Sequence, residues 1–117
     1  MVTVFFDRES LGNYKAQLAL RGVRSAIAKR KYECKLIHEL DGVEPADEHG
    51  KPIIVFSHSE SRSLRILREL SEKGYRPVFI VNRISGAEYS VSSVSIDYRY
   101  ACHLLTCRML EDNDRPI

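Results

Sequence analysis

The sequence predicts an α/β fold in which a doubly wound sheet of parallel strands lies between two layers of helix. Short apolar runs of strand length alternate with longer segments of helical periodicity, and this alternation is typical of parallel sheets with right-handed crossovers. The runs Ile53–Phe56 and Val78–Val81 are apolar throughout and Val2–Phe6 is apolar except at Thr3, as expected for strands that are covered on both faces. The chain has 117 residues, enough for one hydrophobic core, so we expect residues 1–117 to form a single α/β lobe.

The first half of the chain predicts two strands joined by one helix. Val2–Phe6 is followed by the polar loop 7–13, and the apolar positions of residues 14–30 recur at helical spacing. Gly22 lies inside this helix, where glycine costs about 1 kcal/mol relative to alanine, so we expect a close approach of the helix to the sheet there. Residues 32–38 form the second predicted strand.

A shortened connection and a capped helix are predicted around the third strand. Residues 41–51 are rich in acids, glycine and proline and predict a loop with room for one short helical turn, where related architectures often have a full helix. The helix after strand 53–56 is predicted to end at Gly74. Ser57 and Glu60 have the spacing of a capping box at its start. Its predicted inward-facing residues are Leu64, Leu67 and Leu70.

The last third predicts two further strands, residues 78–81 and 91–96, and a final helix over residues 98–111. The complete order of elements predicts a three-layer, five-stranded sheet with the flavodoxin-like strand order 2-1-3-4-5. The final helix is expected to pack on this sheet through one apolar face. The residues of that face are Ala101, Cys102, Leu105 and Met109.

Composition excludes several classes of protein. The net charge is only +2, and basic and acidic residues are interspersed, which gives no electrostatic case for binding nucleic acid. Cys34, Cys102 and Cys107 are an odd number without framework spacing, as expected for free thiols in a reducing cytoplasm. No apolar run approaches the roughly 20 residues that cross a bilayer, and the N-terminus lacks the basic region of a signal peptide. We therefore expect a cytoplasmic protein without a membrane partner.

No catalytic centre, metal site or cofactor site is predicted. His103 and Cys107 are four residues apart on a predicted helix, but two ligands do not make a zinc site. Ser57 and His58 are adjacent, and the sequence around them is not a nucleophile elbow. The loop 7–13 matches neither the dinucleotide-binding fingerprint nor the Walker pattern. We expect a protein that is not an enzyme and needs no cofactor.

Polar side chains follow the predicted strands where those strands end. Because the carboxyl ends of parallel strands meet at one edge of a sheet, these side chains are expected to lie together, with the start of the first helix beside them. Hydrogen-bonding groups beside one aromatic ring suit a sugar or a nucleoside. Each of these residues also has an ordinary interpretation as a loop or cap residue. The set is Asp7, Asn13, Tyr14, Ser57, His58, Asn82, Arg83 and Asp97.

Several segments, in order, resemble a known family. RPVFIVNR (76–83) precedes a loop and VSSVSIDYRYACHLLTCRML (91–110), and NYKAQLALRGVRSAIAKRKYECKLI (13–37) precedes them all. KPIIVFSHSES (51–61) and NDRPI (113–117) occupy matching positions. Together these segments resemble the periplasmic-binding-protein-like sensor domain of lactose-repressor (LacI/GalR) type transcription regulators, and the resemblance covers nearly the whole chain.

The resemblance implies that this chain is the N-terminal lobe of a two-lobed sensor. A small polar effector, such as a sugar or nucleoside, would bind between the lobes at the strand-end residues. DNA would be bound only by a separate N-terminal domain outside this chain. The first helix contributes to dimer contacts in that family, so the resemblance implies a homodimer with Arg21, Arg24 and Lys29 at the interface.

Two alternatives remain open on the sequence. The first is a fragment of a transport-type solute-binding protein of the same fold. The second is a small flavodoxin-like or receiver-like domain that is complete at this length and carries a flavin or a phosphorylatable aspartate. Half of a two-lobed site is also expected to bind its effector weakly on its own.

Overall fold

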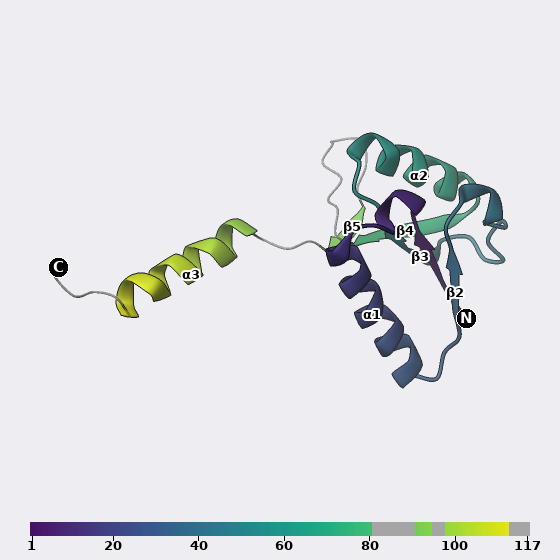
Figure 1. The fold of residues 1–117 in the computed structure, drawn as a ribbon. Helices are drawn as coiled ribbons and strands as arrows, with labels where there is room; N and C mark the ends of the chain where they lie inside the picture. Colours follow the sequence, from purple (N-terminus) through teal and green to yellow (C-terminus); the bar gives the residue numbers. More distant parts are fainter. Residues whose placement is uncertain (81–90, 95–97, 113–117) are drawn as a thin grey trace.

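The computed structural model describes residues 1–80, 91–94 and 98–112, and it has five strands and three α-helices within them (Figure 1). The strands are β1 (Val2–Phe6), β2 (Cys34–Ile37), β3 (Lys51–Phe56), β4 (Tyr75–Ile80) and β5 (Ser92–Val94). The helices are α1 (Tyr14–Lys29), α2 (Glu60–Glu72) and α3 (Tyr98–Asp112), with short 3-10 turns η1 (Arg8–Ser10) and η2 (Leu40–Gly42).

All neighbouring strands are parallel, and the sheet has the order β2-β1-β3-β4-β5. The predicted fold class and strand order are therefore confirmed. β3 and β4 each begin earlier than their apolar runs, at Lys51 and Tyr75, because the two strands pair along their full lengths. The end of the predicted fourth strand and residues 95–96 of the predicted fifth lie outside the described residues.

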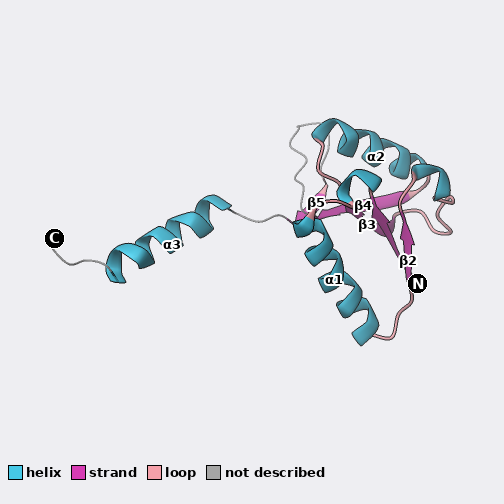
Figure 2. Ribbon diagram, viewed as in Figure 1, coloured by secondary structure: helices cyan, strands magenta, loops and turns pink. Residues whose placement is uncertain are grey.

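Helices α1 and α2 cover opposite faces of the sheet (Figure 2). Successive strand residues point to opposite faces, so each buried strand supplies both layers of the core. On the α2 face, Phe5, Val55 and Phe79 pack with Ile66 and Leu70. On the α1 face, the cluster consists of Val4, Phe6, Ala16, Leu20, Ile27 and Phe56. Of the predicted inward residues of α2, Leu67 and Leu70 are buried and Leu64 is half-buried.

The connection over residues 41–51 is short, with the single turn η2, as predicted. It covers the α2 face without a full helix because Leu40 and Val43 are themselves buried in that core. The Nζ atom of Lys73 donates to the carbonyl oxygens of Leu40 and Val43 at 3.1 and 2.8 Å. The Tyr75 hydroxyl donates to the carbonyl oxygen of Glu44 at 2.9 Å. The loop is thus held by the end of α2 and the start of β4.

The predicted capping box at Ser57 and Glu60 is wrong. Helix α2 begins at Glu60, and Ser59 is its N-cap, with its Oγ atom accepting from the backbone N–H of Arg62 at 3.4 Å. Ser57 is fully buried, and its Oγ atom accepts a 3.0 Å hydrogen bond from the hydroxyl of Ser63. Ser57 lies two residues before the real cap, directly after the last residue of β3, and its hydroxyl is engaged by Ser63 instead.

The expected close approach at Gly22 is also wrong. A Cβ atom built there would have no neighbour within 4 Å, and Gly22 lies in an exposed stretch of α1. Gly74 differs, because its φ of +90° lies in the left-handed region. The prediction that α2 ends at Gly74 is confirmed, since Lys73 is the C-cap and the Gly74 N–H donates to the carbonyl oxygen of Ser71.

These two glycines are expected to respond oppositely to alanine. Gly22→Ala should raise the free energy of unfolding by about 1 kcal/mol, because alanine is the better helix former and the site is open. Gly74→Ala should lower it by about 1–2 kcal/mol, because a side chain is strained at a left-handed φ. Urea unfolding followed by circular dichroism measures both. A stabilising Gly74→Ala or a destabilising Gly22→Ala would contradict this account.

The expected packing of the last helix against the sheet is wrong for this structure. Helix α3 extends away from the body (Figure 1), and the side chains of residues 99–112 are exposed. The radius of gyration is 17.7 Å and the longest dimension is 65 Å. A compact chain of this length would have a radius of gyration of about 13 Å. The apolar face that the sequence assigned to α3 is therefore exposed in this structure.

Candidate functional site

The carboxyl edge of the sheet brings together the segments that follow β1, β2 and β3. The backbone N–H of Asp7 donates to the carbonyl oxygen of Phe56 at 3.0 Å, which extends the pairing of β1 with β3 by one residue. The Nδ1 atom of His38, just beyond β2, lies 3.0 Å from the carbonyl oxygen of Phe6. Asp7 is therefore the central strand end, with His38 on one side and Ser57 on the other.

Asp7 carries a fully buried carboxylate that is held by Arg62. The Asp7 side chain has no exposed surface, and the Arg62 Nε atom donates to its Oδ2 atom at 2.7 Å. This hydrogen bond, above all, raises the pKa of Arg62, and the charges of Asp7, Glu9 and Glu39 add to it against the effect of burial. The guanidinium is thus a permanent cation. It fixes one oxygen of a carboxylate that would otherwise be costly to bury.

Three buried polar atoms at this edge have no hydrogen-bond partner among the described residues. They are the Oδ1 atom of Asp7, the Oγ atom of Ser10 and the Nε2 atom of His58. Asp7 and Ser10 follow β1, and His58 follows β3. Most buried polar groups in proteins are paired with protein or water, so unmet groups mark positions where water or a ligand is expected. The carboxyl edge is where these unmet groups gather.

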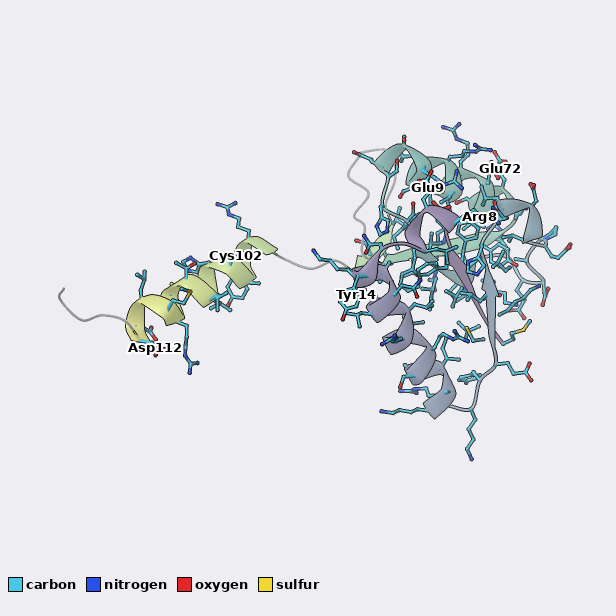
Figure 3. The ribbon with its side chains drawn as sticks, viewed as in Figure 1. Arg8, Glu9, Tyr14, Glu72, Cys102 and Asp112 are labelled. Atoms are coloured by element: carbon cyan, nitrogen blue, oxygen red, sulfur yellow. The ribbon has the colours of Figure 1, made fainter. Side chains whose placement is uncertain are left out.

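A hollow of about 380 Å³ adjoins this edge. It lies over the start of α2 and beside η1, where Glu9 points toward α2 (Figure 3). The Arg62 side chain lines the hollow and also contacts the buried Asp7, so it connects the open surface to the buried carboxylate. Its lining residues are Glu9, Ser59, Ser61, Arg62 and Arg65. Hydroxyl groups, guanidinium groups and one carboxylate offer both donors and acceptors to a polar molecule.

The structure places the predicted site residues in different environments. Asp7 is buried and unmet on one oxygen, while Ser57 is turned inward and bonded to Ser63. His58 is half-buried, and its Nε2 atom is unmet. Asp7 and His58 therefore each have an atom at the carboxyl edge that can still form a hydrogen bond, whereas the hydroxyl of Ser57 is already hydrogen-bonded within the protein.

Two other predicted residues lie at the start of α1. Asn13 is the N-cap of that helix, and its Oδ1 atom accepts from the backbone N–H of Ala16 at 2.9 Å. Tyr14 is 74% exposed and points away from the body (Figure 3). Its ring is available to a ligand only where that ligand reaches the outside of α1. The predicted residues Asn82, Arg83 and Asp97 lie outside the described residues.

Sequence reasoning missed the residue that organises this edge, Arg62. It is 55 positions from Asp7 and belongs to no recognisable motif. One signal was present: the order 2-1-3 sets β3 beside β1, so a basic residue in the first turn after β3 lies near the end of β1. Glu9, Ser10 and His38 were also missed. They occupy segments that the sequence marks only as loop or strand end.

The remaining sequence hypotheses about chemistry find no site in the described residues. The Sγ atom of Cys107 lies 3.7 Å from the Nε2 atom of His103, but within residues 1–80, 91–94 and 98–112 no group of three metal-ligating side chains exists. Cys34, Cys102 and Cys107 are free thiols. The hydroxyl of Ser57 pairs with Ser63, as described above, which leaves no Ser57–His58 contact to activate a nucleophile.

Comparison of the chain with protein-family models, with curated protein sequences and with solved structures finds no match. Among the described helices, none combines the length and apolar character that crossing a membrane requires. Arg21, Arg24 and Lys29, the candidate dimer residues, lie on exposed positions of α1. The case for function therefore depends on the geometry of the carboxyl edge.

Proposed function

We propose that this chain is a ligand-sensing lobe of a LacI-type transcription regulator and that the carboxyl edge of its sheet forms half of an effector site. The observation that carries the proposal is the Asp7–Arg62 pair. A fully buried carboxylate, fixed through one oxygen at 2.7 Å and unmet on the other, lies beside an open hollow at the carboxyl ends of parallel strands. Open α/β sheets bind ligands at that edge.

The charge balance of the edge favours a neutral, hydroxylated ligand. Asp7 and Glu9 supply negative charge, and Arg62 contacts both, at 2.7 and 4.0 Å. Arg65 is occupied by Glu69 at 3.1 Å. One guanidinium faces two carboxylates and the other is paired, so the edge has no excess of positive charge to attract an anionic ligand. Its groups offer fixed donors and acceptors instead. Sugars and nucleosides match such a surface because their hydroxyl groups both donate and accept.

The mechanism is a shift in the equilibrium between lobe arrangements rather than catalysis. A ligand held between this edge and an opposing lobe favours the closed arrangement because it contacts that arrangement better. In the parent regulator, closure would change the contact between two subunits, for which Arg21, Arg24 and Lys29 are the candidates on α1. DNA would be bound by a separate domain, and the protein would act in the cytoplasm.

Ligand titration of the chain by nuclear magnetic resonance tests this proposal. With a panel of monosaccharides and nucleosides, at least one compound should shift the amide signals of Asp7, His58 and Arg62 with a dissociation constant of about 1 mM, since one lobe supplies only part of the contacts. Asp7→Asn should abolish the shifts, and Glu72→Gln, on exposed helix far from the edge, should retain them.

Three results would overturn the proposal. No shift at this edge with any compound at tens of millimolar would remove its basis. A submicromolar complex would show a self-sufficient pocket instead of half a site. Stable labelling of the protein by acetyl phosphate, lost in Asp7→Asn, would assign the edge to a receiver-like domain.

A further inference from the structure

Helix α3 carries two apolar stripes, and both are exposed. One stripe contains Leu105, which is 63% exposed, together with Ala101, Cys102 and Met109 at spacings of one, three and four residues. The other contains Tyr100, Leu104 and Cys107 on a different side of the helix. A helix that is apolar on more than one side is typically buried. The composition of α3 is therefore typical of a buried helix, although its side chains are exposed. We expect another surface to cover it.

The sheet has a partly exposed apolar surface on the side that carries α1. On the α1 side, Ile54, Val78 and Ile80 are half-buried and Val94 is 61% exposed; we name these four residues the open face. Strand register places them together, because Val94 pairs with Ile80, and Ile54 pairs with Val78. Helix α1 covers the Phe6 and Phe56 side of the same layer, and Ile54 and Ile80 pack against the edge of that cluster. Among the described residues, Val78 and Val94 lie outside the cluster.

The flank of α1 that borders the open face is built for close helix packing. Ala19, Gly22 and Ala26 form a stripe of small residues beside the buried positions of α1. In a right-handed β1-α1-β2 crossover, this flank faces β3 and the strands beyond it. Nothing lies within 4 Å of a Cβ atom built at Gly22. A second helix therefore has room to lie beside α1 on the open face.

We propose that α3 docks on the open face of a second copy of this chain and that the two copies exchange their α3 helices. The first stripe, Ala101, Cys102, Leu105 and Met109, would pack on Ile54, Val78, Ile80 and Val94 of the other copy. Such a stripe covers roughly 350 Å², the open face loses roughly 250 Å², and the exchange doubles both, for about 1,200 Å² in total, at the lower end of the range of stable interfaces.

A second copy fits better than the helix's own body for two reasons. Folding back would cover the first stripe and would leave Tyr100, Leu104 and Cys107 exposed, whereas a two-fold dimer brings two copies of the second stripe into one assembly, where they would be able to pack on each other. The helix is also already extended, in a molecule 65 Å long. Exchange keeps that arrangement and requires only that the second copy supply its open face.

Cross-linking between single-cysteine chains tests the exchange directly. One chain carries Ile80→Cys with Cys34, Cys102 and Cys107 all changed to serine, and the other retains only the native Cys102. Refolded together and mildly oxidised, the two chains should form a disulfide-linked heterodimer. A third chain that contains both Ile80→Cys and Cys102 should give mainly links between chains. A link confined within that third chain would show that α3 folds onto its own sheet and would overturn the proposal.

Light scattering on the unaltered 13.4 kDa chain supplies an independent readout. We expect the unaltered chain to be a dimer. Leu105→Asp should raise the dissociation constant of this dimer by at least 100-fold. Thr106→Asp, on the polar side of α3, should change the dissociation constant by less than threefold. Arg24→Glu should not change the dissociation constant of the dimer. A monomeric wild-type chain, a dimer unaffected by Leu105→Asp, or a dimer lost with Arg24→Glu would each contradict the exchange.

Discussion

Replacement of Arg62 by methionine is expected to lower the free energy of unfolding by about 3–5 kcal/mol, because it leaves a buried charge without its partner. The Asp7 carboxylate is fully buried, and Arg62 donates to it at 2.7 Å. Methionine retains most of the packing of the arginine stem, so the loss reports mainly on the charge. Urea unfolding followed by circular dichroism measures it.

Two further variants make this prediction specific. Arg65→Met breaks the Arg65–Glu69 pair, which is an exposed pair on the surface of α2, and should cost at most about 0.5 kcal/mol. Asp7→Asn combined with Arg62→Met should recover a large part of the loss, because the uncompensated charge is then gone. Equal effects of Arg62→Met and Arg65→Met would show that the buried pair contributes no more than a surface pair.

The contribution of Arg62 should not depend on pH in the neutral range. Its pKa is raised in the folded state, chiefly by the hydrogen bond to Asp7. A group with a raised folded-state pKa contributes its full stability below its unfolded pKa and loses it only as the pH rises through the folded value. For an arginine both values lie in strong alkali. Arg62 itself therefore adds no pH dependence to stability between mildly acidic and mildly basic solution.

Phe56→Ala is expected to lower the free energy of unfolding by about 3–5 kcal/mol through loss of apolar contacts and the cavity that remains. Phe56 is fully buried at the end of β3, and its ring centroid lies 5.1 Å from that of Phe6. The matched control is Tyr14→Ala at a 74% exposed position, where we expect a change within about 0.5 kcal/mol. Chemical unfolding of both variants gives the comparison.

This core position also supports the candidate site. The carbonyl oxygen of Phe56 accepts from the N–H of Asp7, and Phe6 directly precedes Asp7 in the chain. A cavity between Phe6 and Phe56 should loosen the end of β1, so amide hydrogen exchange at Asp7 should accelerate in Phe56→Ala by more than at the far end of β3. A loss below about 1 kcal/mol would mean that the core repacks without a cavity.

Local pattern was enough to predict the sheet and the strand ends that line its edge. Ile53–Phe56 is apolar throughout and Val2–Phe6 is apolar except at Thr3, and such runs are typical of parallel strands covered on both faces. The alternation of strands and helices then restricts the topology to a few choices, of which 2-1-3-4-5 is the one formed. Asp7, Ser57 and His58 follow from that topology because parallel strands end at one edge.

Residues whose roles depend on neighbours distant in sequence could not be assigned in this way. Arg62 became central only because β3 lies beside β1, which brings it within 2.7 Å of a carboxylate 55 residues away. The Asn13 side chain could accept a hydrogen bond either from a ligand or from a helix N-terminus. In the structure it accepts from the first turn of α1 and caps that helix. Likewise, the Ser57 hydroxyl accepts a hydrogen bond from Ser63 in the interior.

The amino-acid sequence by itself determined the class of fold, the strands of the core and the set of polar strand ends, because these follow from local periodicity and burial. Only the tertiary structure decided which polar groups are satisfied and which remain unmet, because that depends on distances between segments far apart in the chain. It also decided the position of α3. A helical period identifies an apolar face, but packing alone determines which surface that face meets.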